Sequence, residues 1–456
     1  MSPPGWRWRA GLLALWAAVG LYALWGARTV PFHPDESTFL FMSQDFDRLV
    51  LEGRPAAVTW RAEGQPALVA RYRLLDAPMG RYLAGLGRAL AGEPPLAQDW
   101  NWSASWEANV QAGALPSERA LAAARLPATL LTALSIWLIY GLGHRLGGRA
   151  TGLAAAVLGV AGGLLLLHGR RAMSEGPLVF FSLLTIWLLL RDRPKPLLVA
   201  LALAAAVASK LTALTLLPVA GLALLLPPAG LAAPGRGGWQ AASRRLALFG
   251  VGLALALWAL HPPLWSAPLA GLQAMRLARQ DFLAEQTAFV QSIAPHVRLP
   301  GLGLRGLSLL YHLYFAPLAY ADVSQYAAAT AAAEQRYAAL PLHTGLHTGS
   351  FSFNFVGGGL LLALTLVGVL QTGHDLWAQR RSLTASAGRM RARLVLAAWT
   401  ITTVVGLLAI AVPAQRYYVP LAPIVCLWAA YPMTTLARII RQALQPISRE
   451  PVTTRD

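Results

Sequence analysis

Two adjacent carboxylates, Asp35 and Glu36, follow closely behind the first long apolar segment of the chain, which runs from about residue 10 to 27. A segment of that length can cross a bilayer. Acidic side chains at the mouth of a membrane helix are costly to keep beside lipid, and they usually bind a cation or take part in chemistry. A carboxylate held there can remove the proton of a hydroxyl group as a general base. The sequence therefore predicts a site at this end of the first helix.

Other polar residues stand at or near the ends of later apolar segments, on the face where that first segment exits. Several are cations, which could hold an anionic phosphate at the membrane edge and stabilise it as a leaving group. A lipid-linked sugar phosphate is a donor of this kind, with its tail in the bilayer and its phosphate at the surface. Beside Asp35 and Glu36, the candidate site residues are His33, Asp76, Arg81, Arg125, Arg170, Arg171, Glu175, Lys210, Arg416 and Tyr417.

The composition indicates an integral membrane protein. The 456 residues are 56% hydrophobic and only 13% charged, and the mean hydropathy is +0.49. The net charge of +18 does not require a nucleic-acid partner, because membrane proteins concentrate arginine and lysine in cytoplasmic loops. The single cysteine, Cys426, lies in an apolar segment and is expected to be a buried thiol.

The fold class predicted from the apolar runs is an all-α polytopic membrane protein with about ten transmembrane helices. The basic start of the first run (Arg7, Arg9) is not followed by a small-residue cleavage site, so we expect that run to be retained. A region around 301–320 is apolar enough to be re-entrant or interfacial. The predicted spans are 10–27, 120–142, 150–167, 177–190, 196–209, 211–228, 246–260, 352–371, 394–412 and 418–437.

Charge asymmetry predicts the orientation. With the N-terminus inside, the inner segments carry 19 basic and four acidic residues, whereas the outer segments carry 19 basic and 16 acidic residues. We therefore expect a multi-pass plasma-membrane protein with both termini cytoplasmic and the candidate site extracytoplasmic. Residues 1–445 would form one transmembrane domain, followed by a short cytoplasmic tail at 446–456.

Two predicted outer segments are long, at about 28–119 and 261–351. In the first, Phe39–Leu51 and Pro78–Ala91 combine apolar and charged residues at helical spacing. Both patterns favour amphipathic helices that lie in the membrane interface. The second is rich in tyrosine and histidine, which commonly anchor a protein at the headgroup level.

Six short motifs occur in order along the chain and on one predicted face: His33-Pro-Asp-Glu36, Asp76-x-Pro-x-Gly-Arg-Tyr82, Arg125-Leu-Pro127, Arg171-x-x-x-Glu175, Ser209-Lys210 and Arg416-Tyr-Tyr-x-Pro-x-x-Pro423. Each alone is a weak signal, but the ordered set is more specific. It resembles the polyprenyl-phosphate-dependent glycosyltransferases of the C superfold, in particular the protein O-mannosyltransferase and lipid A aminoarabinose transferase group.

The resemblance implies an inverting glycosyltransferase that moves a hexose or pentose from a polyprenyl-phosphate carrier to a protein, lipid or glycan acceptor on the outer face. Asp35 would match the catalytic acid of that family, Glu36 its acidic neighbour, and Glu175 an acid that binds the acceptor or a metal. Lys210 and Arg416 would match cations on the phosphate side, and Arg125 the arginine of the second span. One departure is Asp76-Ala77-Pro78, where the mannosyltransferases carry His-Pro-Pro. The second is the expected lack of a C-terminal periplasmic domain, and both bear on the acceptor more than on the reaction.

Structural explanations compete with each of these roles. Asp35 and Glu36 would also suit a helix N-terminus, Glu175 could pair with Arg171 one turn away, and Lys210 could reach from the helix end to the interface. Arg125 and Arg416 could be interface anchors, and His33 is expected to make a local hydrogen bond.

Two functional questions stay open in the sequence. A non-enzymatic flippase or transporter of lipid-linked sugars is the alternative to an enzyme, although such proteins favour polar residues at mid-membrane depth and paired, broken helices. No cofactor is predicted with certainty. Asp35 and Glu175 are compatible with a weakly held divalent metal ion, but no dedicated ligand spacing is visible.

Overall fold

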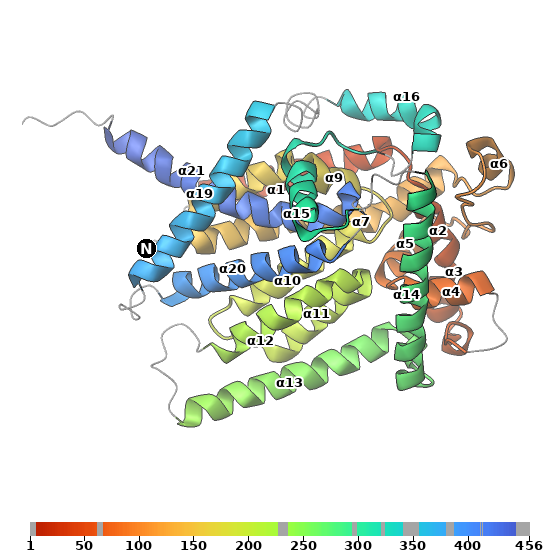
Figure 1. The fold of residues 1–456 in the computed structure, drawn as a ribbon, viewed down its shortest axis with the longest axis horizontal. Coiled ribbons are helices and arrows are strands. Elements are labelled where there is room, and N and C mark those ends of the chain that lie inside the picture. Colours follow the sequence, from red (N-terminus) through yellow and green to blue (C-terminus); the bar gives the residue numbers. More distant parts are fainter. Residues whose placement is uncertain are drawn as a thin grey trace, which may run out of the picture.

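The computed structural model describes residues 6–61, 67–226, 236–293, 299–320, 324–340, 355–379, 387–410, 412 and 414–443. Every regular element in these ranges is a helix, so the predicted all-α class is confirmed (Figure 1). The predicted tail at 446–456 and the last part of the second outer segment, from 341 to 351, lie outside the described residues.

Long, roughly aligned helices, together with shorter helices that continue or connect them, form the body of the molecule (Figure 1). In chain order they are α1 (Trp6–Thr29), α7 (Glu118–Gly147), α8 (Arg149–Ala161), α9 (Gly163–Gly169), α10 (Glu175–Leu189), α11 (Pro196–Ser209), the 3-10 helix η3 (Leu211–Leu216), α12 (Leu217–Leu225), α13 (Arg236–Leu260), α19 (Phe355–Gln379), α20 (Ala387–Leu408), the 3-10 helix η8 (Gln415–Leu421) and α21 (Ala422–Ala443).

Each of the ten predicted spans overlaps a helix or helix pair, although residues 227–228, 352–354 and 411 of these spans lie outside the described residues. Fewer than ten have the length of a complete span. Among the described residues, six helices are long and apolar enough to cross a membrane, and the bent pair α8 and α9 would make a seventh. The other three predictions fall on shorter apolar helices, α10, α11 and the run 211–225. At 1.5 Å per residue a helix of 15 residues reaches only about 22 Å, less than the hydrocarbon core of about 30 Å. The structure thus supports six or seven complete spans in a multi-pass membrane protein.

The bent pair breaks at Gly162, where the chain turns by 62° between α8 and α9. Gly162 has φ −74° and ψ 88°, outside the helical region, and its amide N–H bonds back to the carbonyl of Gly159 at 3.2 Å. The turn directs α9 toward the short segment 170–174, which leads into α10. The bend therefore decides where Arg170, Arg171 and Glu175 lie.

The shorter apolar helices pack among the other helices of the bundle, which cover much of their surface. Val199, Leu203 and Ala206 of α11 are all completely buried, and they belong to the main hydrophobic cluster with residues of α7, α10, α13, α20 and α21. Helices that are buried on most sides need less length, since other helices rather than lipid satisfy their surfaces.

The first outer segment folds into short helices at one end of the bundle (Figure 1). These are α2 (Pro34–Met42), α3 (Gln44–Phe46), the π-helix η1 (Asp47–Leu51), the 3-10 helix η2 (Pro55–Ala57), α4 (Ala67–Leu75), α5 (Met79–Leu90) and α6 (Trp106–Gln111). The predicted helix at Pro78–Ala91 corresponds closely to α5. The prediction at Phe39–Leu51 is divided among α2, α3 and η1, and the helical conformation begins earlier, at Pro34.

The small residues of α5 explain how it packs against α7. A Cβ atom added at Gly87 would lie 2.2 Å from the backbone oxygen of Ala123, so only glycine permits this approach. Gly80, Ala84 and Gly85 are also on the buried face. Close packing of α5 on α7 holds the first outer segment against the bundle.

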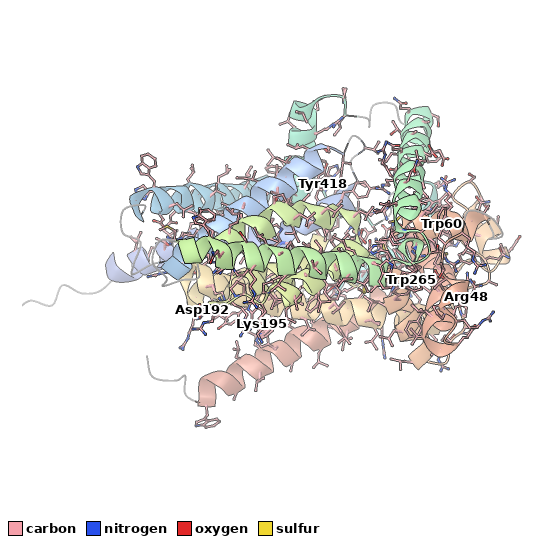
Figure 2. All side chains as sticks on the ribbon, turned by 90° about the horizontal axis from the view of Figure 1, so that it is seen from below. Arg48, Trp60, Asp192, Lys195, Trp265 and Tyr418 are labelled. Atoms are coloured by element: carbon pink, nitrogen blue, oxygen red, sulfur yellow. The ribbon has the colours of Figure 1, made fainter. Side chains whose placement is uncertain are left out.

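The second outer segment contributes η4 (Pro262–Leu264), α14 (Pro268–Ile293), α15 (Leu302–Leu310), the π-helix η6 (Tyr311–Phe315), η7 (Ser324–Tyr326) and α16 (Ala327–Ala338). Helix α14 runs across the end of the bundle rather than along it, beside α4 (Figure 1). Figure 2 shows Arg48, Trp60 and Trp265 at this end, with Asp192 and Lys195 toward the other end. The predicted outer segments around Arg48, Trp60 and Trp265 thus lie at one end of the bundle. The predicted inner turn at 191–195 lies toward the other end.

Candidate functional site

A cavity of about 450 Å³ lies where the two outer segments meet the ends of the bundle helices. Helices α2, α4 and α14 line it, together with the turn before α10, the junction between α11 and η3, and the start of η8. Seven charged side chains face it: Asp35, Arg71, Asp76, Glu175, Lys210, Arg279 and Arg416. Five of these, all but Arg71 and Arg279, were candidates from the sequence.

Asp35 and Arg416 form an ion pair in this cavity, although 381 positions separate them in the chain. The bond joins Arg416 Nη1 to Asp35 Oδ2, and the two side chains are 15% and 26% exposed, respectively. Asp35 lies in the first turn of α2, whose helix is started by His33 and Pro34. The first and last parts of the chain thus meet at the predicted base.

Glu175 and Lys210 form a second pair, with 2.8 Å between Lys210 Nζ and Glu175 Oε1. The Glu175 side chain is only 1% exposed, whereas that of Lys210 is 24% exposed. Glu175 is the first residue of α10, a position where a negative charge is favoured by the helix dipole. The pairing explains the site of the only lysine near this end, because a buried carboxylate needs a cationic partner.

Tyr417 links the two cations. Lys210 Nζ lies 5.1 Å from the centroid of its ring, and the guanidinium carbon of Arg416 lies 5.5 Å from it. Its hydroxyl oxygen also accepts a hydrogen bond of 3.3 Å from Gln286 on α14. Two cations beside one aromatic ring form a compact positive region that can bind a phosphate group.

The backbone at Lys210 explains why two apolar helices can meet with almost no loop. Lys210 is extended, with φ −160° and ψ 134°, between the end of α11 and the start of η3. This one extended residue turns its side chain out of the apolar packing and toward the cavity. The predicted junction at Ser209-Lys210 therefore has a definite structural role.

Asp76 also faces the cavity, and no hydrogen bond to its carboxylate is recorded among the described residues. Burial raises its pKa to about 6, reinforced by the negative charges of Asp35 and Asp99, while Arg81 and Arg279 partly oppose the rise. Because its pKa is close to neutral, Asp76 can gain or lose a proton near physiological pH.

An acidic residue that sequence reasoning missed lies beside it. Asp99 accepts a hydrogen bond of 2.8 Å from Thr38 and another from the Tyr72 hydroxyl. Thr38 and Tyr72 both line the cavity, as does Trp102. Burial raises the pKa of Asp99 and that of Tyr72, so the tyrosine stays a neutral phenol. A lone aspartate before an Asn-Trp-rich stretch gave no signal in the sequence.

Glu36 lies outside the cavity, in the protein interior. Its carboxylate pairs with Arg125 at 2.7 Å and 2.8 Å, and the amide N–H of Ala172 donates a further bond of 2.8 Å. Although burial by itself raises the pKa of Glu36, Arg125, Arg171 and the Ala172 amide hold it below its usual range. Glu36 also closes the capping box of α2 with His33. The helix-cap explanation is therefore correct for Glu36.

Three arginines that the sequence placed among the candidate site residues, Arg125, Arg170 and Arg171, also connect parts of the fold. Arg125 donates to the carbonyls of Ala27 and Val30, and Arg170 donates to the Tyr337 hydroxyl at 2.8 Å and the Tyr22 carbonyl at 2.9 Å. Arg171 donates to the carbonyls of Pro31 and Tyr320. Each of these arginines is at most 3% exposed. They hold the first outer segment and α16 to the bundle instead of facing the cavity.

His33 and Arg81 likewise lie behind the cavity wall. His33 is completely buried, and its Nδ1 accepts the amide N–H of Asp35 at 3.1 Å, the local bond that the sequence suggested. Arg81 pairs with Asp45 at 3.3 Å and donates to the backbone carbonyl of Asp76 at 2.6 Å. Both residues therefore set the positions of the two cavity acids that neighbour them.

No cluster of three or more histidine, cysteine, aspartate or glutamate side chains suited to a metal ion occurs in the part of the chain that the structure describes. The two acids named as metal candidates, Asp35 and Glu175, each have a cationic partner. A divalent ion at this site would have to compete with Arg416 and Lys210.

A smaller, mostly apolar cavity of about 100 Å³ adjoins the charged one. The two cavities share Leu211 and Thr212 of η3, directly after Lys210. Trp399 and Leu407 of α20 form part of its far wall. The charged cavity therefore lies next to a mostly apolar space between membrane helices.

Helix α14 is the wall that the sequence did not reveal. Arg279, Phe282 and Gln286 line the cavity from one of its faces, at spacings of three and four residues. That spacing places the three residues on one side of a helix. It could have revealed this wall in the sequence, but the segment was interpreted mainly through its aromatic residues.

Comparisons with known proteins agree with the sequence pattern over part of the chain. Residues 115–265 match the family described as dolichyl-phosphate-mannose-protein mannosyltransferase. This segment contains Arg125, Glu175 and Lys210. No curated protein matches the chain.

Solved structures give longer but more distant alignments. The Archaeoglobus fulgidus oligosaccharyltransferase tethered with an acceptor peptide is 12% identical, over 94% of this chain and 50% of that one, with a TM-score of 0.49. ArnT from Cupriavidus metallidurans in the apo state is 15% identical, over 95% and 63%, with a TM-score of 0.47. The same enzyme bound to undecaprenyl phosphate is 16% identical, over 95% and 63%, with a TM-score of 0.43. The alignments thus span between half and two thirds of those longer proteins. In sequence, residues 115–265, which contain the motifs at Arg125, Arg171–Glu175 and Ser209-Lys210, are similar to the dolichyl-phosphate-mannose-protein mannosyltransferase family.

Proposed function

We propose that this protein is an inverting glycosyltransferase that transfers a sugar from a polyprenyl-phosphate carrier to a hydroxyl group of a protein, lipid or glycan acceptor. The observation that carries the proposal is a single cavity lined by the carboxylates of Asp35 and Glu175 and by the cations of Lys210 and Arg416. A transfer of this kind needs a base for the acceptor and positive charge for the departing phosphate.

In the proposed reaction, Asp35 removes the proton of the acceptor hydroxyl. The acceptor oxygen forms a bond to the anomeric carbon while the bond from that carbon to the phosphate oxygen breaks. The phosphate leaves with the electron pair, and Lys210 and Arg416 stabilise its negative charge. Attack from the side opposite the phosphate inverts the anomeric centre. Glu175 holds Lys210 in place and contacts the acceptor.

The Asp35–Arg416 pair is then a resting arrangement. The donor phosphate is a diester with one negative charge, and it gains a second charge as the sugar leaves, so its interaction with the guanidinium of Arg416 strengthens during the transfer. When the donor phosphate takes Arg416, the Asp35 carboxylate becomes available to the acceptor. Donor binding would therefore precede activation of the base.

The adjoining apolar cavity supports a lipid-linked donor over a water-soluble one. Its lining by Leu211, Trp399 and Leu407 suits an isoprenoid tail, and it begins directly beside Lys210. A ligand with an anionic head and a hydrocarbon tail would satisfy both cavities together. A water-soluble sugar nucleotide would use only the charged one.

The test is a transfer assay on the full-length protein in lipid nanodiscs, with a radiolabelled polyprenyl-phosphate sugar as donor. Release of polyprenyl phosphate that depends on protein supports the proposal. No release, together with movement of the intact donor across proteoliposome membranes, would favour the flippase. An arm with a chelator measures metal dependence in the same assay.

We also propose that the protein lies in the plasma membrane, with the cavity outside and both termini in the cytoplasm. Support comes from the charge asymmetry and from the separation of the first outer segment from the turn at 191–195 (Figure 2). The single native cysteine, Cys426, is buried, so introduced cysteines can be labelled selectively. An impermeant maleimide should label Arg54→Cys in intact cells and Asp192→Cys only after lysis. Labelling of Asp192→Cys in intact cells, with Arg54→Cys labelled only after lysis, would show that the protein has the opposite orientation.

A further inference from the structure

The cations of the cavity divide into three that have a carboxylate partner and one that does not. Lys210 pairs with Glu175, Arg416 with Asp35, and Arg71 with Glu285. Arg279 also lines the cavity, but no ion pair or hydrogen bond of its guanidinium is recorded among the described residues. An arginine that faces an accessible cavity without an ion pair to a carboxylate is open to an anionic ligand.

Helix α14 fixes the position of this arginine. Glu285 of α14 bonds to Arg71 of α4, and Gln286 of α14 bonds to Tyr417 of η8, so the helix is attached to both walls. The Arg279 guanidinium carbon lies 5.4 Å from the centroid of the Phe282 ring, one turn further along. An aromatic contact orients the guanidinium while leaving its N–H groups available for a ligand.

Arg279 is distinct from the phosphate-side cations. Gln286, which contacts Tyr417 beside Lys210 and Arg416, is seven positions further along α14. At 1.5 Å per residue this is about 10 Å along the helix. The positive charge of Arg279 instead acts on Asp76, where it lowers the pKa against the effect of burial. Arg279 therefore lines a different part of the cavity from Lys210 and Arg416.

We propose that Arg279 binds an anionic group, a phosphate or a carboxylate, carried by the acceptor close to the hydroxyl that receives the sugar. This inference rests on the proposed transferase function and narrows its acceptor class. Neutral acceptors would leave the guanidinium without a partner, whereas an anionic acceptor would be held in place by it. The donor phosphate would occupy the separate region around Tyr417.

The experiment compares three small acceptors that share a hydroxyl group: glycerol, glycerate and glycerol 3-phosphate. Each is offered with the same labelled polyprenyl-phosphate sugar, and both products, glycosylated acceptor and released polyprenyl phosphate, are measured. We expect kcat/KM for at least one of the two anionic probes to exceed that for glycerol by about tenfold or more, the range expected for charge-assisted hydrogen bonds. The two anionic probes distinguish a phosphate from a carboxylate preference.

Arg279→Gln should remove this preference by lowering kcat/KM for the anionic probes to the level measured for glycerol. Arg279→Lys should retain part of it. The matched control is Arg276→Gln, one turn away on the same helix and also exposed, which does not line the cavity. Equal rates for neutral and anionic probes would overturn the proposal. An increase in donor KM in Arg279→Gln would overturn it too, by assigning the arginine to the donor.

A binding measurement separates this inference from the proposed function. Equilibrium dialysis with radiolabelled glycerol 3-phosphate needs no turnover, and it should show binding to the wild-type protein and to Arg276→Gln but about tenfold weaker binding to Arg279→Gln. If no polyprenyl phosphate is released in any assay while this difference persists, the transferase fails and the anion site stands. Equal binding to all three proteins removes the site.

Discussion

Asp35 and Glu36 are neighbours in the chain but belong to different regions of the molecule. Asp35 is 26% exposed in the cavity, where it meets Arg416, whereas Glu36 is completely buried beneath it with Arg125. Successive residues of a helix point about 100° apart. The first turn of α2 therefore sends one carboxylate to the ligand space and the other into the structural layer.

The two layers use the same residue types for opposite purposes. In the cavity layer, the pairs Asp35–Arg416 and Glu175–Lys210 each include a partner that a ligand can reach. In the buried layer, Glu36, Arg125 and Arg170 are held by bonds to backbone and side-chain groups of the protein. Exposure, rather than residue type, separates side chains that can exchange partners with a substrate from those that hold the site together.

The largest expected effect concerns the cavity layer. Asp35→Asn keeps the size of the side chain but removes the proton acceptor, so the transfer rate should fall by about 10²- to 10⁴-fold. The unfolding temperature should change little, because Asp35 is partly exposed. The measurement is the rate of polyprenyl-phosphate release at saturating donor. A variant that inserts normally and keeps full activity would remove Asp35 as the base.

The buried layer should respond in the opposite way. Glu36→Gln leaves Arg125 as a buried charge without its carboxylate, which should reduce stability by about 3–5 kcal/mol. Loss of monodisperse protein after graded heating measures this effect. The control is Glu52→Gln, which removes a carboxylate that is 43% exposed. If both variants unfold at the same temperature, the structural role of Glu36 is wrong.

A smaller effect is expected for the phosphate-side lysine. Lys210→Met should raise the KM of the donor by about ten- to a hundredfold, the range of a lost charge-assisted hydrogen bond. Lys210→Met should also be made together with Glu175→Gln in one protein. This double variant leaves no buried acid without its cationic partner. Lys195→Met, at the only other lysine of the chain, should leave the KM unchanged. Equal KM values for the donor in all variants would show that Lys210 does not bind the donor.

The smallest effect concerns Asp76, whose pKa is raised to about 6. A raised pKa means that the unfolded state ionises first, so the folded state loses stability as the pH rises from about 4 to 6. Asp76→Asn should therefore be more stable than the wild type above pH 6, by about 1–2 kcal/mol after allowance for solvent screening. The two proteins should unfold at similar temperatures at pH 4. A constant difference across this range would show that Asp76 does not titrate as expected.

Particular helices and residues show how much of the fold and of the cavity could be predicted from the sequence. Apolar runs located a helix or helix pair at every predicted span, because periodic hydrophobicity is written directly in the chain. The count of ten complete spans was too high, because α10, α11 and the run 211–225 are shorter apolar helices. The motifs named Asp35, Asp76, Glu175, Lys210, Arg416 and Tyr417, which the structure brings to one cavity. They did not name Tyr72, Asp99 or Arg279.

The sequence by itself determined a helical, multi-pass membrane protein and the residue types that gather at one end of it. Only the tertiary structure decided which charges face the cavity and which are buried, because the partners of Asp35 and Glu36 lie 381 and 89 positions away in the chain. Local patterns record helix faces and caps, but contacts over such separations depend on how the helices pack. The role of α14 as a wall of the cavity follows from that packing alone.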